Sequence, residues 1–177
     1  MLVFSGESAL SSFQLSACLN QLRGIGVQLN SLTAHYYYFI ELVPNQILSK
    51  TQTSRLCALL QAQEQQGEES QENQVIVAPR VGTISPWCTK AVDILHHCEL
   101  SAIKRVERGI VYRIEGVDAT LLKDKKLLKV LHDPMLESVF FTQDAVQKLF
   151  IEHEPQPLFF VDIIKKANEL YSKPMKI

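Results

Sequence analysis

Apolar positions along this chain follow two periods in turn, the two-residue period of strands and the 3.6-residue period of helices. A first round opens on the apolar run Leu2-Val3-Phe4 and contains the aromatic segment Tyr36–Ile40, whose residue types are enriched in sheets. A second round opens at Val75-Ile76-Val77. The pattern predicts strands at 2–4, 33–42, 75–77 and 102–116, and helices at 8–23, 46–62, 86–98 and 120–132.

The two rounds are offset by 74 residues, which is the distance from Leu2 to Ile76 and again from Ile40 to Ile114. Such a repeat predicts an α/β (α+β) domain over residues 1–150, built from two β-α-β-α units related by a pseudo-twofold axis. Helices are expected to cover one side of the joined sheet, because each helix is apolar along one stripe only.

The predicted helices at 8–23 and 86–98 carry apolar residues at helical spacing, and these mark the faces expected to be buried. The Gln- and Glu-rich run at 61–74 has little to bury and is predicted to be a solvated connector. Thr142 is predicted to cap a short helix through Phe150, and residues 151–177 to begin a linker. The expected buried residues are Leu10, Phe13, Ala17 and Leu22 in the first helix, and Trp87, Ala91, Ile94, Leu95 and Cys98 in the second.

Residues 79–90 predict a strand–loop–helix corner that is suited to a negative charge. Ser85 followed by Pro86 is a helix-start signal, because a Ser side chain caps free amides and Pro fits the first helical position. The amides of the helix end, together with Arg80 and Lys90, could hold an anion or a partner's carboxylate. The plainer interpretation is a well-capped helix with no further role.

Two polar surfaces lie near this corner. Lys90 and Asp93 lie on the polar side of the predicted helix, which is either a solvated face or a surface that meets another domain. In the strand segment 104–109 the basic residues alternate with Val106, which is typical of a strand with one solvated face. Gly109 indicates a bulge or a close backbone approach.

Composition narrows the classes of function. The 18 basic and 19 acidic residues leave a net charge of −1, which gives no electrostatic case for nucleic acid. The apolar runs are too short to span a bilayer, and the N-terminus has no signal-peptide pattern, so we expect no membrane segment. The four cysteines form no CxxC pair and are expected to be reduced. We expect no metal site either: adjacent histidines on a helix point about 100° apart, which disfavours zinc at Cys88, His96, His97 and Cys98.

The corner motif and the strand after it resemble a known family. The run from Pro79 to Ile94, with Arg105-Val106-Glu107-Arg108-Gly109, resembles the N-terminal domain of the large, single-chain phosphoribosylformylglycinamidine synthase. Segments 8–13 and 131–133 are also similar, so the resemblance covers roughly residues 2–164. Cys88 and Pro134 depart from the family pattern, which has Ser and Arg there. The residues that match the motif are Arg80, Gly82, Thr83, Ser85, Pro86, Trp87, Lys90, Ala91, Asp93 and Ile94.

The resemblance implies a non-catalytic docking domain of a cytoplasmic, glutamine-using and ATP-dependent ligase of purine biosynthesis. It implies a fold like a fused pair of the small accessory subunits of the three-protein enzyme, bridging the glutaminase and synthetase domains as partners. ATP and Mg²⁺ would belong to the synthetase halves of the full enzyme, with no cofactor in this chain. The runner-up is a free-standing module that binds phosphate at Ser85, and a weaker alternative is acid–base chemistry by His132 and Asp133. The implied docking residues are Arg80, Thr83, Ser85, Trp87, Lys90, Asp93, Arg105 and Arg108.

Overall fold

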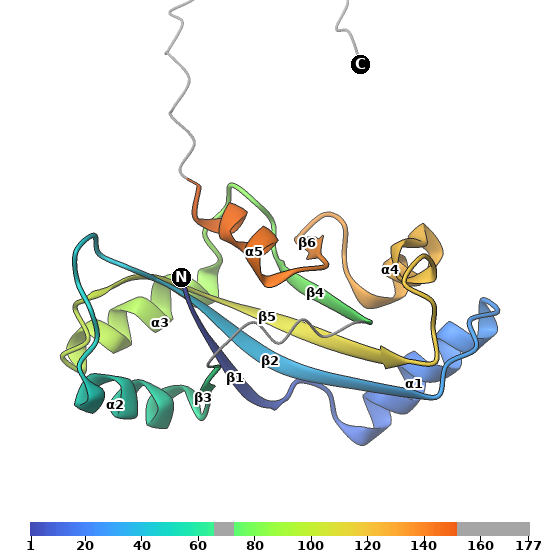
Figure 1. Cartoon of the computed structure of the whole chain (residues 1–177), viewed down its shortest axis with the longest axis horizontal. Helices are drawn as coiled ribbons and strands as arrows, with labels where there is room; N and C mark the ends of the chain where they lie inside the picture. Colours follow the sequence, from blue (N-terminus) through green and yellow to red (C-terminus); the bar gives the residue numbers. More distant parts are fainter. Residues whose placement is uncertain (66–72, 152–177) are drawn as a thin grey trace, which may run out of the picture.

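The computed structural model describes residues 1–65 and 73–151, which form one antiparallel sheet with helices packed mainly on one face (Figure 1). Within these ranges the sheet has six strands in the order β3-β1-β2-β5-β4-β6. The strands are β1 (Leu2–Ser8), β2 (Ser31–Leu42), β3 (Gln63–Glu64), β4 (Gln74–Pro79), β5 (Ile103–Glu115) and β6 (Glu137–Phe140). The helices are α1 (Ser12–Gly24), α2 (Lys50–Leu60), α3 (Pro86–His97), α4 (Lys125–Leu131) and α5 (Gln143–Val146), with short 3₁₀ helices η1 (Leu121–Lys123) and η2 (Gln147–Phe150).

The predicted elements are present, and their ends are set by capping. Helix α1 starts later than predicted because Ser11 caps it with a capping box while Ser8 still belongs to β1. Thr142 caps α5 as predicted. The edge strands β3 and β6 escaped prediction because they are two and four residues long. The predicted linker lies outside the described residues except for Ile151, and so do residues 66–72 of the predicted connector.

The six-stranded antiparallel sheet confirms an α+β fold, and its two halves have the same order of strands and helices. Strands β2 and β5 pair at the centre, β1 lies outside β2, and β4 lies outside β5. The constant offset of 74 residues is wrong, however. Leu2 lies opposite Ile40 in β2, so if Ile40 corresponds to Ile114, the counterpart of Leu2 is the residue opposite Ile114. In β4, Gln74 lies opposite Arg113, so that residue precedes Gln74 and is not Ile76. Strand pairing sets the register, and small differences in segment length between the halves change the residue offset from one strand to the next.

The helix-covered face of the sheet holds two separate core clusters. Figure 1 shows α1 and α4 at one end of the sheet and α2 and α3 at the other. Under α1 and α4 the core includes Leu22 and Ile114, and under α2 and α3 it includes Ile40 and Leu95. Within the described ranges, none of the helices combines the length and the apolar character needed to cross a bilayer.

A third cluster lies on the opposite face and corrects the expectation that helices cover one side only. Val146 and Leu149 of the short α5–η2 segment pack there on Phe39 and Ile76. Both sides of the central strands are apolar, and Phe39 and Ile76 are fully buried, so this face also needs a cover. The sequence pattern of β2, with five consecutive aromatic or aliphatic residues from Tyr36, is the corresponding signal.

The predicted stripes of two helices are confirmed in part: Leu22 and Leu95 are buried, and Leu10, Trp87 and Ala91 pack against the core, but three predicted residues are exposed. Phe13 is 81% exposed and Ile94 is 57% exposed, and Ala17 is exposed as well. The caps at Ser11 and Ser85 fix where each helix begins, and the sets with i, i+3, i+4, i+7 spacing then face the sheet. These sets are Leu15, Cys18, Leu19 and Leu22 in α1, and Cys88, Ala91, Val92 and Leu95 in α3.

Candidate functional site

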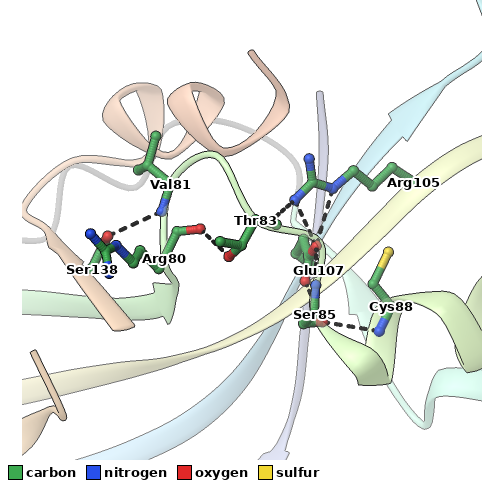
Figure 2. A network of polar contacts seen from close by, with 8 residues as sticks. All are labelled: Arg80, Val81, Thr83, Ser85, Cys88, Arg105, Glu107 and Ser138. Carbon is green, nitrogen blue, oxygen red and sulfur yellow. Dashed lines mark hydrogen bonds and ion pairs between the residues drawn. The ribbon is translucent and has the colours of Figure 1, made fainter. Parts of the chain in front are cut away.

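A buried carboxylate lies beneath the predicted corner. Glu107 of β5 is 0% exposed and accepts four hydrogen bonds (Figure 2). Two come from Ser85: its N–H donates to Oε1 at 3.3 Å and its hydroxyl donates to Oε2 at 2.6 Å. The other two come from Arg105, whose Nε and one terminal nitrogen lie 3.1 and 2.8 Å from Oε1. A buried charge is tolerated when it is paired and fully hydrogen-bonded in this way.

Arg105 connects this carboxylate to the loop between β4 and α3. Its terminal nitrogen also donates to the carbonyl oxygen of Thr83 at 2.6 Å. Its guanidinium lies 5.4 Å from the ring centroid of Phe150 in η2, and its side chain is only 12% exposed. We refer to Ser85, Arg105 and Glu107 as the staple, because together they hold the loop, the helix start and β5 against one another.

The other end of the loop is held by the edge strand β6. The N–H of Arg80 donates to the carbonyl of Leu136 at 3.0 Å, and the N–H of Val81 donates to the hydroxyl of Ser138 at 3.2 Å. The Thr83 hydroxyl donates to the Arg80 carbonyl at 2.6 Å (Figure 2). The loop is therefore fixed at both ends although most of its residues are exposed.

The capping prediction at Ser85 is confirmed. Its side chain accepts the N–H of Cys88 at 3.0 Å, and Pro86 occupies the first helical position. Sequence reasoning did not assign a role to Glu107, whose carboxylate accepts both the N–H and the hydroxyl of the capping residue Ser85. The available signal was the spacing of Arg105 and Glu107, which places both side chains on one face of the strand.

Replacing Ser85 by Ala is expected to cost more stability than an ordinary helix cap. The hydroxyl caps α3 and also donates to the buried Glu107, so its loss leaves a carboxylate oxygen unpaired. We expect the free energy of unfolding to fall by about 2 kcal/mol in urea titrations. Ser11→Ala is the matched control, because Ser11 caps α1 at an exposed position, and it should cost about 1 kcal/mol. Equal costs for the two variants would contradict the role of the staple.

Trp87 and Arg108 form a stacked group beside the staple. The Arg108 guanidinium lies 4.6 Å from the ring centroid of Tyr36 and 5.0 Å from that of Trp87. Trp87 is half-buried and its ring centroid lies 5.8 Å from that of Tyr38. Burial raises the pKa of Tyr38 although the Arg108 charge acts in the opposite direction, so the phenol stays neutral. Tyr36 was not among the predicted site residues.

The remaining predicted site residues face outward. Arg80, Thr83 and Lys90 have exposed side chains, as the docking interpretation requires. Asp93 is exposed as well, and its carboxylate lies 3.7 Å from Nδ1 of His97. The predicted set therefore divides into half-buried residues at the corner (Ser85, Trp87, Arg105 and Arg108) and exposed residues (Arg80, Thr83, Lys90 and Asp93).

A cleft of about 630 Å³ opens between the loop, the central strands and the start of β6. Its lining includes Arg80 and Arg108 as well as Ile110 of β5. It also includes two aliphatic side chains with large exposed fractions, Ile84 at 64% and Leu136 at 69%. Exposed aliphatic groups at the rim of a concave surface are typical of binding sites.

The metal, thiol and His–Asp candidates of the sequence can each be located in the structure. Within 1–65 and 73–151, no group of three His, Cys, Asp or Glu side chains is placed to hold a metal ion. Burial raises the pKa of the Cys88 thiol, which keeps it protonated and unreactive. The His132 ring contacts the Leu128 carbonyl, and a carboxylate oxygen of Asp133 accepts the N–H of Met135.

The chain matches the model of a known family. A family model described as formylglycinamide ribonucleotide amidotransferase N-terminal matches residues 35–150. The matched stretch is more than half of the chain and contains the staple, the stacked Arg108 and the whole lining of the cleft.

Proposed function

The chain belongs to the family of formylglycinamide ribonucleotide amidotransferase N-terminal domains, and from this premise we propose that it is a docking domain of that purine-biosynthesis enzyme. In this proposal it bridges the glutaminase and synthetase domains of a cytoplasmic ligase. Glutamine hydrolysis and the use of ATP and Mg²⁺ then belong to those domains, and this chain supplies no catalytic group.

The observation that carries the proposal is the construction of the corner. The staple and β6 hold the loop from below, while Arg80 and Lys90 project their charges outward. A surface that is fixed before binding loses little conformational entropy when a partner docks. A helix cap alone does not need a buried Arg–Glu pair beneath the loop, so capping by itself does not explain why this pair is present.

The runner-up, a phosphate module at Ser85, is disfavoured by the same geometry. An anion at the start of α3 would lie against the Glu107 carboxylate, which already receives both the N–H and the hydroxyl of Ser85. Two negative groups in contact at a buried site repel each other strongly.

The proposal predicts that charge reversal at the corner weakens association without unfolding the chain. We expect the double variant Arg80→Glu, Lys90→Glu to bind the remaining synthetase and glutaminase domains, supplied in trans, at least tenfold more weakly than the wild type. Loss of a desolvated charge pair at an interface costs about 2–5 kcal/mol. The measurement is a calorimetric or fluorescence titration at physiological ionic strength, together with the rate of glutamine-dependent product formation in the reconstituted mixture.

The matched control reverses two other exposed cations. Lys125→Glu, Lys126→Glu makes the same change in net charge at the start of α4, and should leave the affinity unchanged. Equal weakening by both double variants would indicate non-specific charge attraction. Unchanged affinity in the Arg80, Lys90 variant would sink the docking role of the corner.

A further inference from the structure

Arg108 is a half-buried cation without a carboxylate partner in the part of the chain that the structure describes. Its guanidinium stacks on Tyr36 and Trp87, and no ion pair forms between it and residues 1–65 or 73–151. By contrast, Arg105, three positions earlier on β5, is paired with Glu107. Stacking fixes the plane of a guanidinium and leaves its N–H edge free to bind a carboxylate with two parallel hydrogen bonds.

The cleft around Arg108 is positively charged and has an aliphatic rim. Arg80 lines it as a second cation, and the one carboxylate in its lining is Glu137, which already accepts the N–H of Asp133 at 2.9 Å. Ile84 and Leu136 offer aliphatic surface beside these charges. A free anion would use the cations and gain nothing from the aliphatic groups, whereas a polypeptide segment can use both.

We propose that the cleft receives a segment of a neighbouring domain that carries an Asp or Glu side chain flanked by aliphatic residues. The carboxylate binds the Arg108 guanidinium, and the aliphatic side chains pack on Ile84 and Leu136. This assignment rests on the proposed docking function, and it moves the centre of the interface from the outer corner to the cleft floor. An arginine held in a stacked pocket is the kind of residue that carries a large share of interface energy.

The chain contains a natural reporter for this cleft. Trp87 is its single tryptophan, and the Arg108 guanidinium lies 5.0 Å from its ring centroid. The 177-residue chain labelled with 5-fluorotryptophan therefore gives one ¹⁹F resonance, which responds to changes at Arg108. The unlabelled synthetase and glutaminase domains, added together, contribute no ¹⁹F signal.

Titration of the labelled chain with those domains is expected to shift or broaden the resonance. Arg108→Gln should weaken the association at least tenfold, and Ile84→Ser, at an exposed position that does not support the core, should weaken it about threefold or more. Arg23→Gln, an exposed cation at the end of α1, should leave the affinity unchanged. Arg108→Lys keeps the charge without the planar fork, so an intermediate loss is expected.

The outcomes separate this inference from the docking proposal. If the wild-type chain does not bind the other domains, both fail. If it binds, and Arg108→Gln and Ile84→Ser bind equally well, the cleft is not the interface while the docking function stands. A resonance shift produced by 10 mM inorganic phosphate alone, lost in Arg108→Gln, would identify a free-anion site and overturn the inference. The inference would also be overturned if changing Glu68, Glu69 and Glu72 to Gln shifted the ¹⁹F resonance of the unbound chain. Such a shift would mean that Arg108 already has a carboxylate partner within this chain.

Discussion

Glu107→Gln is expected to lower the free energy of unfolding by about 3–5 kcal/mol. Glu107 is completely buried and Arg105 nearly so, and removal of one member leaves a guanidinium uncompensated in an apolar setting. The two Ser85 donors lose their acceptor charge at the same time. Urea denaturation at pH 7, followed by circular dichroism, measures the change directly.

Glu41→Gln is the matched control for this substitution. Glu41 pairs with Lys104 at 3.3 Å, but both side chains reach solvent, so its loss should cost at most about 1 kcal/mol. We also expect Glu107→Gln to weaken docking in molecules that remain folded, because the 80–85 loop loses its support. A cost below about 1 kcal/mol would show that the staple is not what holds the corner.

Gly109→Ala is the second substitution with a large expected effect. A Cβ atom at Gly109 would lie 2.7 Å from the Val77 carbonyl oxygen and 3.1 Å from the Phe39 ring. Because the first of these atoms is backbone, β4 must move away from β5, and we expect a loss of about 3 kcal/mol in the free energy of unfolding. This contact also confirms the close backbone approach that the sequence indicated at Gly109.

Gly24→Ala provides the comparison, since a Cβ there meets nothing within 4 Å. Gly24 is the last residue of α1, and Ala should be neutral or should stabilise the protein by up to about 1 kcal/mol. Thermal unfolding of both variants tests the pair. A Gly109→Ala variant as stable as Gly24→Ala would mean that the two strands separate at little cost.

Local signals in the sequence were sufficient for most elements of the fold. Ser85 before Pro86, and Ser11 before its helix, are short-range capping signals whose outcome depends on a few neighbouring residues. The buried stripes were harder to predict from the sequence, because Phe13 and Leu15 both belong to plausible apolar faces of α1. Contact with the sheet decides between them.

The candidate site depended on contacts that residue spacing does not reveal. Arg80, Thr83 and Lys90, which the resemblance implies as docking residues, have exposed side chains. The resemblance placed Arg105 and Arg108 in one docking set, but strand positions three apart face opposite sides of a sheet. Arg105 therefore meets Glu107 and Phe150 on one side, while Arg108 meets Tyr36 and Trp87 on the other.

The central pairing of β2 with β5 has a consequence for how the chain folds. Ser31 and Glu115, joined by a hydrogen bond at one end of this pairing, are separated by 84 residues in sequence. Closing so long a loop costs entropy before any contact across the centre is made. High contact order of this kind slows folding. We therefore expect the encounter of the two halves, rather than formation of individual helices, to limit the rate at which newly made chains reach the native state.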